Sequence, residues 1–179
     1  MMRRIHGPDT PWQRDRWEIP VVVTGTTIIW RDATTALGLT GIAAYSDIVE
    51  FTLTIWRRGI VDPFGHHRSM RRHDTGDGVS PEFLRVGVVV ADGRTATNLD
   101  DVDAASDLVL ASHGGFSGPG GEQQQYRMWP LPPPGPFALV VQWPVAGLTE
   151  RHIPLDADAI RHAAGRVESA WPDATQPAP

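Results

Sequence analysis

The chain contains no cysteine and no lysine among its 179 residues. Without cysteine it has no disulfide, no thiolate metal ligand and no cysteine nucleophile. Without lysine it has no phosphate-binding loop of the Walker type, no kinase ATP site, no Schiff base and no Ser-Lys hydrolytic site. The two absences therefore exclude several large classes of enzyme, and the lack of cysteine suits a cytoplasmic protein.

Long apolar runs and a strong net charge are also missing. No apolar run approaches the length of a membrane-spanning helix, and the polar segment 1–16 lacks the apolar core of a signal peptide. The net charge of -5 at pH 7 argues against binding to nucleic acid or to an anionic membrane. A hydrophobic fraction of 41% suits one globular domain, which we expect at 17–171 between flexible arms at 1–16 and 172–179.

Short apolar segments with an alternating pattern are abundant. Between Val49 and Trp56, apolar residues alternate with polar ones, which is the period of a half-buried strand. Similar segments occur at 17–23, 26–31, 36–45, 82–91, 94–99, 123–131, 137–143 and 148–153. The pattern predicts an all-β fold, a mainly antiparallel β-sandwich or a partly open barrel.

Three local features indicate how these strands are connected and how the fold ends. The Asp92-Gly93 pair is typical of a type I′ hairpin turn. Trp129 to Pro136 predicts a rigid proline corner, because proline fixes φ and removes a backbone donor. Apolar residues between Ile160 and Trp171 recur at helical spacing after Asp156, a suitable N-cap, so we expect one C-terminal α-helix.

The hairpin, the proline corner and a third block carry a resemblance. Arg85 to Asn98, Trp129 to Pro136 and Gln142 to Pro144 resemble the corresponding blocks of a family of uncharacterised actinobacterial proteins. The resemblance covers roughly Trp17 to Trp171 and implies a recurring fold. It implies no activity, substrate or catalytic residue.

A long polar connection at 57–81 is the first candidate binding site. It is rich in arginine and histidine, and Trp56 at its base is expected to point away from the apolar face of its strand. Arginine binds carboxylates bidentately and tryptophan is a common interface anchor. The candidate partner- or anion-binding residues are Trp56, Arg57, Arg58, His66, His67, Arg68, Arg71, Arg72 and His73. We therefore hypothesise a non-enzymatic protein that binds another protein, with no cofactor and no metal.

The alternative is a small enzyme or small-ligand-binding protein. Its site would lie between the 57–81 loop and a glycine-rich loop at 112–121. His67, His73 or His113 would act as acid–base groups there, and Phe116 would anchor the ligand. The sequence leaves the oligomeric state open.

Two short motifs are weak. Asp74-Thr75-Gly76 matches the tripeptide of aspartic proteases, but the chain holds no second copy and such enzymes need two aspartates. Asp101, Asp103 and Asp107 lack the glycine and the terminal glutamate of an EF-hand. Neither motif predicts a site.

Overall fold

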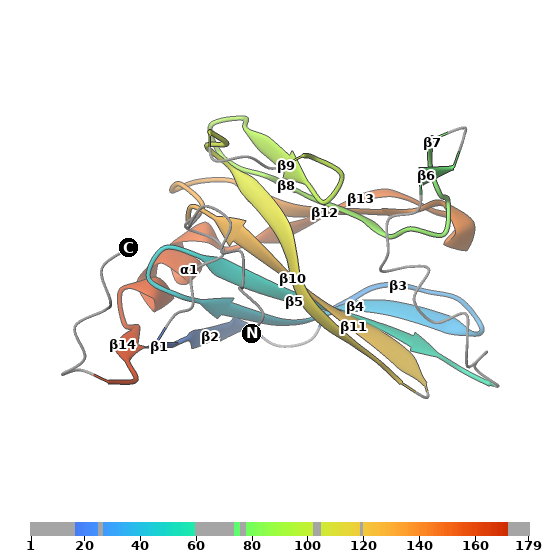
Figure 1. Ribbon diagram of the computed structural model, residues 1–179, viewed down its shortest axis with the longest axis horizontal. Coiled ribbons are helices and arrows are strands. Elements are labelled where there is room, and N and C mark those ends of the chain that lie inside the picture. The colour runs from blue at the N-terminus through green and yellow to red at the C-terminus, as the bar shows by residue number, and fades with distance from the viewer. Residues whose placement is uncertain are drawn as a thin grey trace, which may run out of the picture.

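The computed structural model shows an all-β sandwich with one C-terminal helix (Figure 1). The described residues are 17–24, 27–59, 74–75, 78–101, 105–118 and 120–171. Two antiparallel sheets form the layers and are not closed into a barrel. The predicted sandwich is therefore confirmed. The arms expected at 1–16 and 172–179 lie outside the described residues.

The larger sheet has six strands and the smaller sheet has four. The larger sheet has the order β10 (Val109–Gly118), β11 (Gly121–Trp129), β5 (Val49–Arg57), β4 (Thr35–Ala44) and β2 (Val21–Thr24), and β3 (Thr27–Arg31) pairs with the other half of β4. The smaller sheet has the order β13 (Leu148–Leu155), β12 (Phe137–Trp143), β8 (Arg85–Val89) and β9 (Thr95–Thr97).

Short elements complete the described fold. Two pairs of short strands are β1 (Glu18–Ile19) with β14 (Glu168–Ser169), and β6 (Asp74–Thr75) with β7 (Gly78–Val79). A 3-10 turn, η2 (Pro144–Ala146), joins β12 to β13. Pro20 separates β1 from β2 at the edge of the larger sheet, as expected for a residue that cannot donate to a ladder.

The core lies between the two sheets, because each central strand turns every second side chain inward. On β5, Phe51 and Leu53 are buried while their neighbours are partly exposed, which confirms the alternating pattern. Phe51 meets Phe137 of the smaller sheet with ring centroids 6.1 Å apart. Trp30 and Trp143 pack edge to face across the same interior, with centroids 6.2 Å apart.

The proline corner has the predicted role. It carries the chain from β11 in the larger sheet to β12 in the smaller one (Figure 1). The Trp129–Pro130 peptide bond is cis. Leu131 packs against the core, and Arg161 of the helix donates to the Pro132 carbonyl at 3.3 Å. The corner therefore contacts the core through Leu131 and the helix through Pro132.

The turn between β8 and β9 differs from the predicted type. Gly93 N donates to Val90 O at 2.9 Å, so Ala91 and Asp92 are the central residues of the turn. Gly93 has a φ of 86°, and no described residue other than glycine has a positive φ. A type I′ turn needs positive φ at both central residues, so that prediction is wrong. The hairpin itself is confirmed.

The C-terminal helix is shorter than predicted. α1 spans Ala157–Ala164, and the Asp156 carboxylate accepts from Ala159 N at 2.8 Å, which confirms the N-cap. The helix stops at Gly165, and Glu168–Ser169 pair with β1 as a strand instead. Glycine disfavours helix, and β1 supplies backbone partners to the residues that follow. The buried face of α1 packs against β2 and β4. Within the described part of the chain, no helix has the length and apolarity needed to cross a membrane.

Candidate functional site

The structure describes the two ends of the predicted 57–81 loop, at 57–59 and at 74–75 and 78–81. Trp56, Arg57 and Arg58 stand at the end of β5 and just beyond it. The other candidate residues, His66, His67, Arg68, Arg71, Arg72 and His73, lie outside the described residues. Their role as a partner-binding loop therefore stays a prediction.

Trp56 and Arg57 point to opposite faces of the larger sheet. Trp56 is 37% exposed on the outer face, as its place in the alternating pattern predicts. Its indole lies over Gly38 of β4, where an added Cβ would come within 2.8 Å of the ring. Arg57 follows on the inner face, so the two side chains do not form one flat binding surface.

Arg57 is held inside the sandwich by two neighbours. Its Nη2 contacts Oε1 of Glu122 at 2.9 Å, and the Glu122 side chain is only 1% exposed. The guanidinium also lies over the Trp143 ring, 5.6 Å from the centroid. The indole of Trp143 donates to the Glu82 carbonyl at 2.9 Å. Arg57 therefore anchors the end of β5, and Arg58 is the exposed arginine of the pair.

The predicted glycine-rich loop at 112–121 is a strand and a tight turn. Residues 112–118 belong to β10 and pair with β11, with a bulge between Ser112 and Gly114. The alternative site, expected between the 57–81 loop and a loop at 112–121, therefore lacks the second of these loops. The two segments are nevertheless adjacent, because Arg57 N donates to Gly120 O at 2.8 Å.

The glycines of β10 serve packing. Gln124 of β11 is buried, and its amide donates to Ser112 Oγ at 2.6 Å and also to the Gly114 carbonyl. A Cβ on Gly115 would lie 2.8 Å from Gln123 O and 3.0 Å from the Gln124 side chain. Only glycine leaves room for this buried amide.

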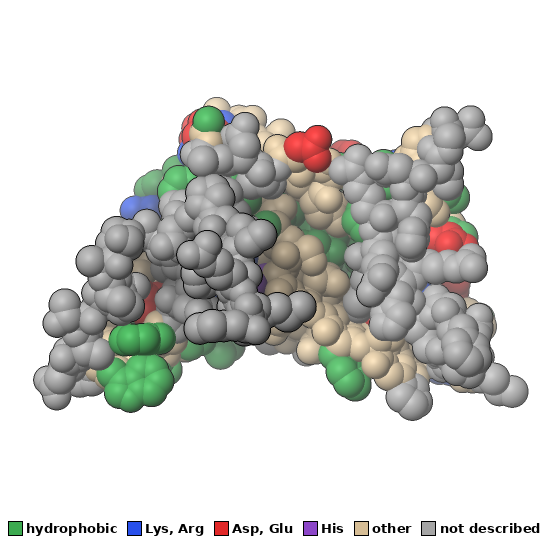
Figure 2. Space-filling model, in the orientation of Figure 1, with side chains coloured by type: hydrophobic (Ala, Val, Ile, Leu, Met, Phe, Trp, Pro, Cys, Tyr) green, Lys and Arg blue, Asp and Glu red, His purple; other side chains and the backbone are tan. Residues whose placement is uncertain are grey.

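β10 forms an outer edge of the larger sheet. β11 pairs with one side of it, and no described strand pairs with the other side. Natural edge strands are usually guarded by charges, prolines or short length. β10 has ten residues, VLASHGGFSG, with no arginine, acidic residue or proline. Between the grey areas of Figure 2, the surface over β10 and β11 is mostly tan, the colour of uncharged polar side chains and backbone.

Phe116 is the large apolar side chain of this edge. It is 71% exposed, almost twice the exposure of Trp56. Phe116 pairs with Gln123, and Gln123 pairs with Thr54 of β5. Paired residues share a face, so Phe116, Gln123, Thr54 and Trp56 all lie on the outer face of the larger sheet. We define the β10 edge as β10 (Val109–Gly118) with the Phe116 side chain.

A second exposed apolar feature joins the two ends of the fold. Trp17 and Trp171 are 41% and 59% exposed, and their rings meet edge to face with centroids 5.6 Å apart. Green side chains gather over β1 and β14 at the lower left of Figure 2. The Ala170 amide donates to the Trp17 carbonyl at 2.7 Å and holds the two segments together.

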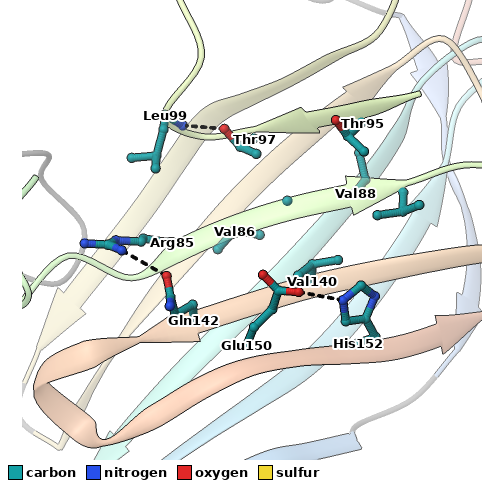
Figure 3. A pocket seen from close by; sticks show the side chains of 12 residues that line it. Arg85, Val86, Val88, Thr95, Thr97, Leu99, Val140, Gln142, Glu150 and His152 are labelled. Carbon is teal, nitrogen blue, oxygen red and sulfur yellow. Dashed lines mark hydrogen bonds and ion pairs between the residues drawn. The ribbon is translucent and has the colours of Figure 1, made fainter. Parts of the chain in front are cut away.

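A groove lies on the outer face of the smaller sheet, with a volume of about 380 Å³ (Figure 3). Its floor follows one register row across four strands. Gly87 pairs with Thr97 on one side and Val140 on the other, and Val140 pairs with His152. Gly87 has no side chain, so the groove reaches the backbone there, beside the Thr97 methyl group, which lies 3.3 Å from where a Cβ would be.

Polar side chains surround the groove. Arg85 Nη1 donates to Gln142 Oε1 at 2.9 Å, and His152 Nε2 contacts Glu150 Oε1 at 2.9 Å. Figure 3 shows Gln142 between Arg85 and Glu150. The groove therefore combines an apolar floor with groups of both charge signs. No group of three or more His, Asp or Glu side chains in the described chain is arranged to hold a metal ion.

Comparisons with models of protein families, with curated proteins and with solved structures give no significant match to this chain. Functional interpretation therefore depends on the surfaces of the molecule, above all on the β10 edge and on the groove of the smaller sheet. Sequence reasoning singled out Trp56 and Phe116 but placed Phe116 in a loop. It missed the groove, because Gly87, Val140 and His152 are neighbours only through strand pairing.

Proposed function

We propose that the protein is a binding protein, not an enzyme, and that it binds an extended segment of another protein along the β10 edge. The open side of a strand presents alternating N–H and C=O groups. Another extended backbone is the chemical complement of this row. The nature of the partner thus follows from the chemistry of the edge.

The length and composition of β10 carry the proposal. Ten extended residues span about 30 Å, long enough to pair with a segment of similar length. The absence of charge along β10 removes the repulsion that normally guards an edge. Small side chains on the edge leave room for larger residues of the partner strand.

Phe116 supplies side-chain selectivity to this backbone pairing. A strand added beside β10 lies about 4.8 Å away, so a residue of the partner strand would contact the Phe116 ring directly. Aromatic and β-branched residues form favourable cross-strand pairs. We expect partner segments that are uncharged at this position and apolar.

A peptide library tests this proposal. Nonapeptides displayed on phage are selected on the wild-type protein and then measured against Phe116→Lys and Val145→Lys. Val145 is a matched control, since it is 59% exposed but lies in η2, between strands of the other sheet. Selected peptides should bind wild type and Val145→Lys equally and bind Phe116→Lys at least tenfold more weakly.

Two results would contradict the proposal. One is a library that yields no binder, or binders that Phe116→Lys leaves unaffected. The other is concentration-dependent self-association that Phe116→Lys abolishes, because a second copy of the chain would then occupy the β10 edge.

A further inference from the structure

We infer that the groove on the outer face of the smaller sheet binds a free α-amino acid with an aliphatic side chain. The carboxylate would lie at Arg85, the ammonium group at Glu150, and the side chain over Gly87. This site is independent of the β10 edge, which belongs to the other sheet.

The first observation is a guanidinium without a counter-ion. Arg85 donates to Gln142 Oε1 at 2.9 Å and to the Val79 carbonyl at 3.4 Å, and both acceptors are neutral. None of the ion pairs between described residues involves Arg85. Its Nε is buried and has no hydrogen-bond partner among the residues that the structure describes. A carboxylate is the ligand that arginine forks bind best, and here it would supply the missing negative charge.

The second observation is a carboxylate on the opposite side of Gln142. Glu150 Oε1 contacts His152, and its side chain is 63% exposed. Among the described residues, no hydrogen bond reaches Oε2 of Glu150. Figure 3 shows Arg85 and Glu150 flanking Gln142. A simple anion would meet Glu150 and a simple cation would meet Arg85, whereas a zwitterion is complementary to both.

The third observation is the apolar hollow beside these charges. Gly87 is buried, and the row from Thr97 to Val140 has no side chain at its centre. Val89 of β8 extends the apolar lining. A volume of about 380 Å³ lies in the range of small-molecule sites. The hollow suits an aliphatic side chain, because valines line it and no Phe, Tyr or Trp ring does.

NMR titration with three related compounds tests the inference. L-Leucine carries both charges, 4-methylpentanoate lacks the ammonium group, and 3-methylbutylamine lacks the carboxylate. We expect leucine to shift the methyl resonances of Thr97, Val89 and Val140, and to bind at least tenfold more tightly than either analogue.

Two charge-neutralising variants test each half of the site separately, because each should weaken leucine and strengthen one of its analogues. Glu150→Gln should weaken leucine at least tenfold and strengthen 4-methylpentanoate, because a repelling carboxylate is removed. Arg85→Gln should weaken leucine equally and strengthen 3-methylbutylamine. Arg94→Gln is the control, since Arg94 pairs with Asp92 in the β8–β9 turn at 2.8 Å and does not line the groove. It should leave all three affinities unchanged.

The inference is overturned if leucine at 10 mM, about the weakest affinity of interest, shifts none of the groove methyl groups. It is equally overturned if leucine and its analogues bind alike, or if leucine binding survives both Arg85→Gln and Glu150→Gln. Backbone amide spectra of each variant show whether it is still folded. Glu150→Gln is the variant least expected to unfold, because Glu150 is exposed.

Discussion

Arg57 and Glu122 face each other inside the sandwich, with Nη2 and Oε1 2.9 Å apart. Arg57 ends β5, and Glu122 lies at the start of β11. The pair therefore holds together the two strands that support the β10 edge. A buried carboxylate is costly unless it is paired and hydrogen-bonded, so this contact stabilises the end of the larger sheet.

Arg57→Met should lower the free energy of unfolding by about 2 kcal/mol, because it removes the cation next to a buried carboxylate. The value is below the roughly 3–5 kcal/mol expected for a fully buried pair, since the Arg57 side chain is 33% exposed. Arg57→Met combined with Glu122→Met should recover much of the loss. Arg58→Met, on the exposed neighbour, should change stability by less than about 0.5 kcal/mol. Urea unfolding compares wild type, Arg57→Met, Glu122→Met, the double variant and Arg58→Met, and additive effects of the two single methionine substitutions would contradict a direct interaction.

Gly121→Ala should destabilise the fold by about 2 kcal/mol or more. A Cβ at this position would lie 2.2 Å from the Ile55 carbonyl oxygen of β5, so the β10–β11 hairpin must shift. Gly41→Ala is the matched control, because the nearest atom to its added Cβ is 3.9 Å away on Thr52. Thermal unfolding compares the two variants. Equal melting temperatures would show that the hairpin is not packed against β5 as described.

Tyr126 makes the free energy of unfolding depend on pH in the alkaline range. Burial raises the pKa of its phenol, while tyrosine in an unfolded chain ionises near about pH 10. The neutral buried form therefore contributes its full stability below about pH 10, and this contribution is lost as the pH rises toward the folded-state value. Tyr126→Phe removes the ionisable hydroxyl and keeps the buried ring.

The same variant should lose less stability than wild type between about pH 9 and 11. Tyr45→Phe is the control, since the chain has two tyrosines and Tyr45 is only partly buried. Chemical unfolding at several pH values measures the difference. Parallel curves for wild type and Tyr126→Phe would contradict the burial of this phenol.

Asp156→Ala should lower stability by about 1 kcal/mol, because its carboxylate caps α1 through Ala159 N at 2.8 Å. Asp158 lies two residues later, in the first turn of the helix, and is exposed. Asp158→Ala should therefore lower stability by less than Asp156→Ala does. Urea unfolding separates the two. A larger loss from Asp158→Ala would show that Asp156 does not cap the helix.

The alternating pattern predicted most of the strands correctly, since burial on one face requires a period of two. It failed at 112–121, where glycine and serine are usually typical of a loop. Gly115 is required there by the buried Gln124 amide, a tertiary contact that no local pattern contains. The helix was predicted too long because apolar spacing alone gives no information that β1 pairs with Glu168–Ser169.

Site prediction from the sequence was limited by register. Alternation was enough to place Trp56 outside, but the ion pair of Arg57 depends on β11 lying beside β5. The groove depends on β9, β8, β12 and β13 pairing in one order. Gly87 indicates a groove only when the strand register shows that Thr97 and Val140 flank it.

The central claim is that the open side of β10 receives a partner strand, and amide hydrogen exchange of β10 tests it most directly. In the free protein, alternate amides between Gly114 and Gly118 should exchange rapidly, while those of β11, which pairs on both sides, exchange slowly. A selected peptide should protect these β10 amides and leave β13 unchanged. Slow exchange throughout β10 in the free protein, or protection by the peptide elsewhere only, would contradict the claim.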